Sequence, residues 1–333
     1  SSSIVINGGT LTIGVGGFNR RLTSTGTLTV SAGTLNINGN LSIPSGTFNQ
    51  SGGNIYVDGN NEGVNDVASG TVLVSFGSGA ANNGTVTGGN LYIIDPPFSG
   101  TARSLELNFT SGTWQWGAGH TTYFGDGTST NTSSNTSGFQ FDTYVGSAST
   151  QSMIGSVVVN GGSATNRWVT TTSASGNGSY VKGSITINAN SELRDIASGG
   201  ILVVAGNIVN NGTLTKANTG LTFGDYTGTS LTAATNSQIV SGSGTFRNSL
   251  SSTTAWFTTL TVNNSSSSGV TVAAGLVPSV SGTTTITTGK FNADTLALTG
   301  SSAQAVALTA AASEINVQNF RLSNAAGVTF SGS

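Results

Sequence analysis

Clusters of acidic residues are the first candidates for chemistry in this chain of 333 residues, which holds only 12 aspartates and glutamates. One stretch, VDGNNEGVND, places four oxygen-bearing side chains around Gly63: Asp58, Asn60, Glu62 and Asp66. Such oxygens around a turn-forming glycine are typical of a Ca²⁺ loop, although Ser69 stands where an EF-hand carries its bidentate glutamate. Two interpretations stay open: a Ca²⁺ site, or a solvated loop between structural repeats, which we favour. We expect no other cofactor.

Aromatic side chains are concentrated between Thr113 and Tyr144, in a protein that is only 7% aromatic. Two alternating tryptophans and two alternating phenylalanines predict two strands, joined by TSTNTSSNTSG, which we expect to be a loop. The candidate ligand-binding residues are Trp114, Trp116, His120, Tyr123, Asp126, Phe139, Phe141, Asp142 and Tyr144. If segment 113–144 is a side insertion, its exposed rings and flanking carboxylates would bind a glycan. If it is a widened coil, the rings fill the core, and we favour this second interpretation.

Catalytic machinery is hard to assemble from the remaining residues. His120 is the only histidine, and no G-x-S-x-G elbow accompanies it, so we expect neither a catalytic base nor a histidine-bound metal. Glycosidase or lyase chemistry needs paired carboxylates, or Ca²⁺-binding acids with a basic residue. In SELRD, Glu192 and Arg194 alternate and predict an ion pair on a solvated face. We therefore expect no enzyme, and keep a carbohydrate-active solenoid, either binder or lyase, as the alternative.

The elements that would have to position any site are very short strands. From Thr27 to Gly59 the chain reads TLTVSAGTLNINGNLSIPSGTFNQSGGNIYVDG, in which a strand begins every six or seven residues. Apolar and small polar residues alternate within each strand, so one face of the strand points into a core. The residues predicted to point inward are Leu28, Leu35, Leu41, Phe48 and Ile55, continued by Leu214, Leu260 and Ile286.

The breaks between these strands favour coils over hairpins. Glycine, serine and asparagine separate the strands without a consistent hairpin signal. Three sides make a coil of roughly 20 residues, and stacked coils make a parallel β-solenoid, that is, a right-handed β-helix. We predict an all-β fold in which residues 1–333 form a single elongated solenoid of about 16 coils. No segment shows helical periodicity.

Charge is scarce in this chain, since charged residues make up 7% of it and the formal net charge is −2. Disordered chains combine low hydrophobicity with high net charge, whereas here 35% of residues are hydrophobic and regularly spaced, so we predict order. The ten lysines and arginines are scattered, which argues against nucleic acid as a partner. No apolar run approaches the ~20 residues of a membrane helix, so we expect no transmembrane segment.

Four phrases in the second half of the chain carry a family resemblance: NIVNNGTLTKANTGLTF, QIVSGSGTFRN, FTTLTVNNSSSSGVTVAAG and TTTITTGKFNADTLALTG. Their order resembles that in the long, repetitive β-solenoid surface proteins of the Bacteroidota, adhesin-like proteins exported by the type IX secretion system. The resemblance is clearest from Gly183 to Ser333 and includes no catalytic motif. Proteins of that kind begin with a signal peptide and end in a sorting domain. Since neither is found here, we expect these residues to be one piece of a longer chain.

The resemblance implies an extracellular, cell-surface protein with a structural and adhesive function. Its implied partners are surface glycans or other extracellular polymers, further copies of itself or the rest of its own chain, and the secretion machinery. Asp294-Thr295-Leu296 resembles the short sequon that is O-glycosylated in that bacterial group, which makes Thr295 a candidate glycosylation site.

Ice binding is a third functional class to consider, because solenoid ice-binding proteins present ranks of threonine on one flat face. Thr-x-Thr pairs occur at Thr10, Thr27, Thr213 and Thr285. The sequences TLN, NLS, NIY and TWQ interrupt them, so no unbroken rank is visible.

Overall fold

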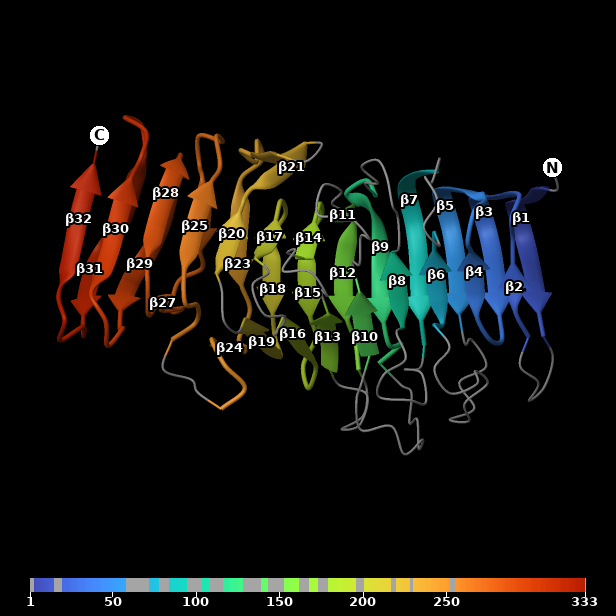
Figure 1. The fold of residues 1–333 in the computed structure, drawn as a ribbon, viewed down its shortest axis with the longest axis horizontal. Helices are drawn as coiled ribbons and strands as arrows, with labels where there is room; N and C mark the ends of the chain where they lie inside the picture. Colours follow the sequence, from blue (N-terminus) through green and yellow to red (C-terminus); the bar gives the residue numbers. More distant parts are fainter. Residues whose placement is uncertain are drawn as a thin grey trace.

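The computed structural model describes residues 3–14, 20–57, 72–77, 84–94, 104–107, 116–127, 139–142, 153–161, 168–172, 179–195, 201–216, 220–227, 230–251 and 255–332. Within these residues the fold is all β, without a helix. No described helix could therefore cross a membrane. The coils stack along the long axis of the molecule, with the first coil at one end and the last coil at the other (Figure 1).

Three parallel sheets form the sides of a β-solenoid, as the sequence predicted. Sheet 1 has 13 strands: β1 (Ser3–Ile13), β3 (Thr27–Ile37), β5 (Thr47–Val57), β7 (Thr85–Ile93), β9 (Gly119–Phe124), β12 (Ser156–Val159), β15 (Ile185–Ile187), β18 (Ile208–Asn210), β23 (Gln238–Ser241), β26 (Val270–Val272), β27 (Ser279–Val280), β29 (Lys290–Leu298) and β31 (Glu314–Leu322). Sheet 2 has nine strands: β2 (Leu22–Thr23), β4 (Leu41–Ile43), β6 (Val74–Phe76), β8 (Leu105–Leu107), β10 (Phe139–Asp142), β13 (Trp168–Thr172), β16 (Glu192–Asp195), β19 (Thr213–Lys216) and β24 (Thr245–Arg247).

Sheet 3 lies on the remaining side and has eight strands: β11 (Met153–Ile154), β14 (Ser179–Val181), β17 (Leu202–Val204), β20 (Leu221–Phe223), β25 (Leu260–Asn263), β28 (Thr284–Thr288), β30 (Gln304–Leu308) and β32 (Val328–Gly332). A small antiparallel hairpin of β21 (Asp225–Thr227) and β22 (Ser230–Thr232) stands apart from the three sheets. Every sheet therefore joins strands that are one coil apart in the sequence.

The predicted inward residues are confirmed. Leu28, Leu35, Leu41, Phe48 and Ile55 have no exposed surface, and Leu214, Leu260 and Ile286 are at most 1% exposed. They do not form one column as expected, because Leu41 and Leu214 lie on sheet 2, and Leu260 and Ile286 lie on sheet 3. One hydrophobic cluster nevertheless joins residues from Ile6 to Val306, so the three sheets share a core.

Several predicted short strands merge into longer, bent ones. The segments TLTV and TLNI form the single strand β3, and TFNQ and NIYV form β5. Glycines make the bends possible: Gly33 and Gly53 have positive φ angles of 76° and 68°. They also stack on one another, since a Cβ on Gly53 would lie 2.8 Å from the Gly33 carbonyl oxygen. A side chain at either position would strain the backbone and clash with the neighbouring coil.

The coils differ more in length than the sequence suggested. Thr27 pairs with Thr47, a step of 20 residues, whereas Asn49 pairs with Thr85, a step of 36. The path along sheet 1 from β1 to β31 passes through twelve strands in the described part of the chain, fewer than the 16 coils expected. Additional sequence between paired strands accounts for this difference.

Buried glutamines hold corners of the solenoid from inside. Gln238 Nε2 donates to two backbone carbonyl groups of the preceding coil, 2.8 and 3.0 Å away, and its Oε1 accepts a hydrogen bond from Asn264 Nδ2 at 2.8 Å. Gln304 repeats these contacts, with Asn324 as the donor to its oxygen at 2.7 Å. Each amide thus satisfies backbone groups that the corner leaves unpaired inside the protein.

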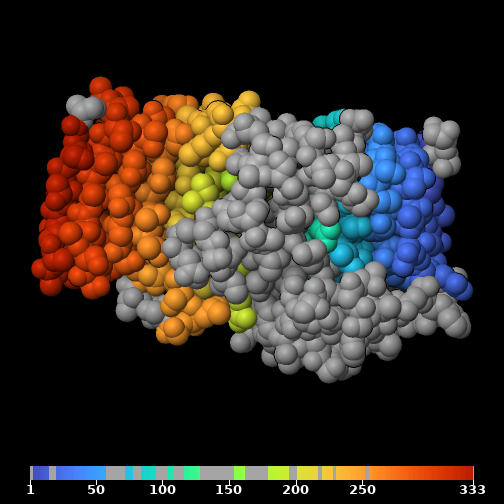
Figure 2. Space-filling model, viewed as in Figure 1, coloured from blue at the N-terminus to red at the C-terminus, as the bar shows by residue number. Residues whose placement is uncertain are grey.

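The last coil exposes apolar side chains. Figure 2 shows the C-terminal coils, in red, forming one end of the molecule. Phe320, Leu322 and Phe330 are 41%, 57% and 56% exposed, and the rings of Phe320 and Phe330 meet edge to face. The expectation that this solenoid contacts another coil or another copy stays a prediction.

Candidate ligand-binding groove

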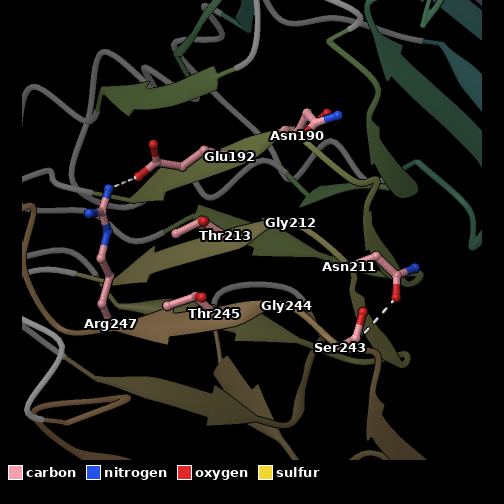
Figure 3. A pocket seen from close by; sticks show the side chains of 10 residues that line it. Asn190, Glu192, Asn211, Gly212, Thr213, Ser243, Gly244, Thr245 and Arg247 are labelled. Atoms are coloured by element: carbon pink, nitrogen blue, oxygen red, sulfur yellow. Dashed lines mark hydrogen bonds and ion pairs between the residues drawn. The ribbon is translucent and has the colours of Figure 1, made fainter. Parts of the chain in front are cut away.

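A polar groove of about 410 Å³ crosses three successive coils where sheet 1 turns into sheet 2 (Figure 3). Each coil contributes one turn and the beginning of one sheet 2 strand. The lining residues are Asn190, Ser191, Glu192, Asn211, Gly212, Thr213, Ser243, Gly244, Thr245 and Arg247. No aromatic or aliphatic side chain is among them, so the groove suits a ligand rich in hydrogen-bonding groups.

Two glycines allow the coils that form the groove to pack closely against one another. A Cβ on Gly212 would lie 2.2 Å from the Ser191 carbonyl oxygen, and a Cβ on Gly244 would lie 2.4 Å from the Gly212 carbonyl oxygen. No side chain fits at either place, so the backbones of successive coils approach closely. The backbone amide of Ser243 also donates to Asn211 Oδ1 at 3.3 Å, and this hydrogen bond links the turns of two coils.

One carboxylate and two hydroxyl groups form a row on one side of the groove. Glu192, Thr213 and Thr245 are paired in register through strands β16, β19 and β24. The residues that follow them, Leu193, Leu214 and Phe246, are buried, so this row points away from the core. Thr245 is exposed and Thr213 is half-buried, which makes both hydroxyls available to a ligand.

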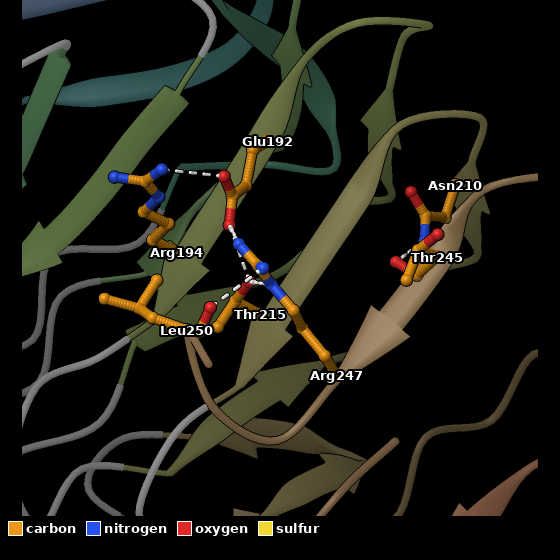
Figure 4. A network of polar contacts seen from close by, with 7 residues as sticks. All are labelled: Glu192, Arg194, Asn210, Thr215, Thr245, Arg247 and Leu250. Atoms are coloured by element: carbon orange, nitrogen blue, oxygen red, sulfur yellow. Dashed lines mark hydrogen bonds and ion pairs between the residues drawn. The ribbon is translucent and has the colours of Figure 1, made fainter. Parts of the chain in front are cut away.

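A charged cluster closes one end of the groove (Figure 4). The carboxylate of Glu192 is ion-paired with Arg247, and its Oε2 lies 2.9 Å from an Arg194 guanidinium nitrogen. Thr215 donates its hydroxyl to Glu192 Oε1 at 2.7 Å and accepts a hydrogen bond from Arg247 Nε at the same distance. Arg247 also donates to the Leu250 carbonyl oxygen at 3.0 Å. The carboxylate is therefore held from three sides.

These contacts decide the ionisation of Glu192. Burial on its own raises the pKa of the carboxyl, but hydrogen bonds from Arg194, Thr215 and Arg247, with the charge of Arg194, outweigh burial and lower the pKa below its ordinary value. A carboxylate that is ionised and already saturated with donors is poorly suited to exchange protons with a substrate. The predicted ion pair between Glu192 and Arg194 is confirmed, but Glu192 is buried and not on a solvated face.

Two of the predicted ligand-binding residues belong to the core. Trp116 and His120 have no exposed surface, and their rings meet edge on, with centroids 4.4 Å apart. Trp116 also meets Phe76 edge to face at 5.7 Å. Burial lowers the pKa of His120 to about 3. These two side chains therefore fill the interior of a coil, as in the interpretation that we favoured, and the alternative in which they present a surface to a glycan does not hold for them.

Tyr123 and Asp126 lie elsewhere. Along β9, residues alternate between buried and half-buried, so Tyr123 points away from the core that encloses His120. Asp126 is half-buried. Phe139, Phe141 and Asp142 form strand β10, which pairs with β8 and β13 as part of sheet 2. Their backbone thus continues the solenoid, and their side chains, with Trp114 and Tyr144, lie outside the described residues.

The other predicted sites have different outcomes. Asp58, Asn60, Glu62 and Asp66 lie outside the described residues, so the Ca²⁺ site stays a prediction. The described part of the chain holds no group of three or more acidic or histidine side chains that could bind a metal. Thr295 lies within β29 and is only 6% exposed, which argues against a glycan on its hydroxyl in the folded protein.

The threonine pairs considered for ice binding do not share one face. Thr10 and Thr27 lie on sheet 1, whereas Thr213 lies on sheet 2 and Thr285 on sheet 3. Thr215, the second threonine of the Thr-x-Thr sequence that begins at Thr213, is fully buried. The flat threonine rank that ice binding requires is therefore not formed by these pairs.

This groove was not predicted from the sequence. A signal was present in three phrases, NSELR, NGTLT and SGTFR, which align position by position from Asn190, Asn211 and Ser243. Their spacings of 21 and 32 residues are unequal, so periodicity did not reveal them.

None of the models of known protein families matches this chain. No curated protein and no solved structure matches it either.

Proposed function

We propose that this chain is a structural and adhesive solenoid that binds glycans without transforming them. The groove across the turns at Asn190, Asn211 and Ser243 is the observation that carries this proposal, because amides, hydroxyls and the ion pair of Glu192 with Arg247 line it. Amide and hydroxyl groups both donate and accept hydrogen bonds, as sugar hydroxyls do. A rigid row of such groups would bind a sugar with little loss of side-chain freedom.

A binding function is favoured over a lyase or hydrolase. Among the described residues that line the groove, Glu192 is the only carboxylate, and Arg194, Arg247 and Thr215 already occupy its oxygens. Glycoside hydrolysis ordinarily needs two carboxyl groups on either side of the scissile bond. The described lining of the groove supplies a polar surface without a second acid.

The proposal includes a location. A surface wetted by hydroxyls and amides rather than by charge, in a chain without cysteine, is consistent with an adhesive protein outside the cell. Export by a type IX system, with the rest of a longer chain and the secretion machinery as partners, belongs to the same proposal and follows from the sequence resemblance. Isolation of the natural protein from cell-surface and culture fractions, with its intact mass, would test both points.

Native affinity electrophoresis through gels that contain defined polysaccharides tests the binding function. The double variant Thr213→Val/Thr245→Val removes two groove hydroxyls and keeps the β-branched shape. We expect it to bind at least about tenfold more weakly than the wild type, because two hydrogen bonds to the ligand are lost.

A matched control changes two outward threonines of sheet 3. Thr261 and Thr285 are paired in register and half-buried, so Thr261→Val/Thr285→Val makes the same chemical change far from the groove. This control should bind like the wild type. Binding by the groove variant that equals binding by the wild type would contradict the proposal. Release of new reducing ends or unsaturated sugars from the polysaccharide would show that the protein is an enzyme instead.

A further inference from the structure

Three tyrosines form a stacked ladder on the outer face of sheet 1. Tyr56, Tyr92 and Tyr123 come from strands β5, β7 and β9 and are paired in register. The ring centroids of Tyr56 and Tyr92 are 4.5 Å apart with an interplanar angle of 8°, and those of Tyr92 and Tyr123 are 4.4 Å apart at 15°. The residues on either side of each tyrosine are buried, so all three rings point outward.

The stacking decides which part of each ring is available. The faces of Tyr92 are covered by its two neighbours, so no sugar can stack on them. The ring edges and the hydroxyl groups remain. Burial and the neighbouring phenols raise the pKa of Tyr92 to about 12, so its hydroxyl is uncharged at neutral pH. The ladder therefore offers a row of hydroxyl groups along an apolar ridge.

A row of small polar side chains runs beside the ladder. Asn54, Asn90 and Thr121 are paired in register two residues before each tyrosine. Asn90 Nδ2 donates to Asn54 Oδ1 at 2.9 Å, so the amides form a ladder of their own. Short side chains next to long ones leave the tyrosine edges standing above this row.

Both rows continue without charge through six coils. The tyrosine row contains Asn36, Tyr56, Tyr92, Tyr123, Val158 and Thr186. The row beside it contains Thr34, Asn54, Asn90, Thr121, Ser156 and Ser184. Strands in a sheet are about 4.8 Å apart, so the rows repeat the same kind of group at that spacing over about 24 Å.

We propose that this charge-free face binds a neutral linear polysaccharide that lies along the solenoid axis, across the strands. This inference rests on the proposed adhesive function and names the class of polymer. Twelve consecutive outward positions without a lysine, arginine, aspartate or glutamate offer nothing to an acidic or basic polymer. Phenol, amide and hydroxyl groups replace the water around sugar hydroxyls, and the ring edges contact the sugar C–H groups.

A second copy of the chain fits this face less well. The centre of a stable protein interface is apolar and excludes water. Apart from the three tyrosine rings, only Val158 is apolar among the twelve positions, so two such faces would each have to give up the hydration of their amides and hydroxyls. A hydroxyl-rich polymer also displaces this water, but its hydroxyl groups replace the lost hydrogen bonds to the same amides and hydroxyls.

Native affinity electrophoresis of the full chain through gels with soluble mixed-linkage β-glucan, or with alginate as the acidic polymer, tests the inference. Tyr56→Thr/Tyr92→Thr/Tyr123→Thr removes the ladder with a residue that the same row already contains at Thr186. Tyr56→Phe/Tyr92→Phe/Tyr123→Phe keeps the stack and removes only the hydroxyls, so it provides a folded variant if the first one unfolds. Compared with the wild type, we expect the threonine variant to bind β-glucan at least about tenfold more weakly and the phenylalanine variant severalfold more weakly. We expect the wild type not to bind alginate.

The outcomes separate this inference from the function that it rests on. Weaker β-glucan binding by both ladder variants supports the inference. Unchanged binding by both, with a loss only in Thr213→Val/Thr245→Val, would overturn it and leave the adhesive function standing. Equal binding of alginate would overturn the charge argument. A ladder-dependent dimer in analytical ultracentrifugation would assign the face to a second copy, and failure of the wild type to bind either polymer would count against both proposals.

Discussion

His120 Nε2 lies 3.2 Å from Gln50 Oε1, although 70 residues separate the two in the sequence. Gln50 Nε2 faces three backbone carbonyl oxygens at 3.2–3.4 Å, so the amide nitrogen is the donor and its oxygen is left to accept. His120 must therefore carry its proton on Nε2. Its Nδ1 is buried and has no hydrogen-bond partner among the described residues. The imidazole thus occupies the place that Asn264 and Asn324 take beside Gln238 and Gln304.

Acid should destabilise the protein through this histidine. Burial lowers the folded pKa of His120 to about 3 from an ordinary value of 6.5, so between these values the unfolded chain binds a proton that the folded chain does not. Stability is fully present above pH 6.5 and is lost as the pH falls toward 3, by about 1.4 kcal/mol per pH unit. Urea unfolding at a series of pH values measures this slope.

His120→Asn is the matched control. Asparagine can donate to Gln50 in the same way as at the other two corners, and it does not titrate. We expect the variant to fold at pH 7 and to lose this part of the slope between pH 6.5 and 3. An unchanged slope would mean that other groups cause the acid sensitivity.

The ion cluster at the end of the groove predicts a second effect on stability. Glu192→Gln leaves Arg194 and Arg247 without their carboxylate, and breaking a buried ion pair costs about 3–5 kcal/mol. Glu314 provides the comparison, because its ion pair with Lys290, at 3.1 Å, is largely exposed. Glu314→Gln should leave the melting temperature nearly unchanged, since exposed pairs contribute little. Similar losses of melting temperature in both variants, measured by thermal unfolding, would mean that the buried cluster contributes no more to stability than the exposed pair does.

Local patterns predicted strand faces well and contacts between coils poorly. Leu28, Leu35 and Phe48 were placed inward correctly, because the period of two is set within a few residues of sequence. Which residue stands above which depends on the length of chain between strands, and this varies from coil to coil. Nothing near Glu192 indicates that Arg247 lies beside it, 55 residues later.

The variable length of chain between strands also explains why the positions of the aromatic residues were not predicted. Trp116 and Tyr123 both lie in the stretch with an unusual concentration of rings. Strand register buries the first and stacks the second on Tyr92, 31 residues earlier. The choice between core and surface could not be made for either one from composition alone.

The corner glycines predict a third outcome. Gly242 has a φ angle of 107°, and a Cβ there would lie 2.1 Å from the Asn210 carbonyl oxygen. Gly242→Ala should destabilise the protein by more than about 1 kcal/mol, because strain and a backbone clash add together. Gly275 also has a positive φ, of 83°, but a Cβ there would meet no atom within 4 Å, so Gly275→Ala should cost only the strain. The difference between the urea midpoints of the two variants measures the cost of the clash alone. Equal midpoints would contradict the prediction that the clash at Gly242 adds to the strain.

Trp116 provides the last prediction, because a place in the core and a role in ligand binding lead to opposite results. Its ring lies between Phe76 and His120 and has no exposed surface, so Trp116→Ala opens a cavity in the core. Large-to-small substitutions of this kind cost about 3–5 kcal/mol, whereas Trp116→Phe should cost less because part of the ring volume stays. Urea unfolding followed by circular dichroism gives both values, and polysaccharide binding is measured under conditions where each variant stays folded. We expect stability to fall in the order wild type, Phe, Ala, with unchanged binding. A binding loss without a change in stability would return Trp116 to the surface and refute its place in the core.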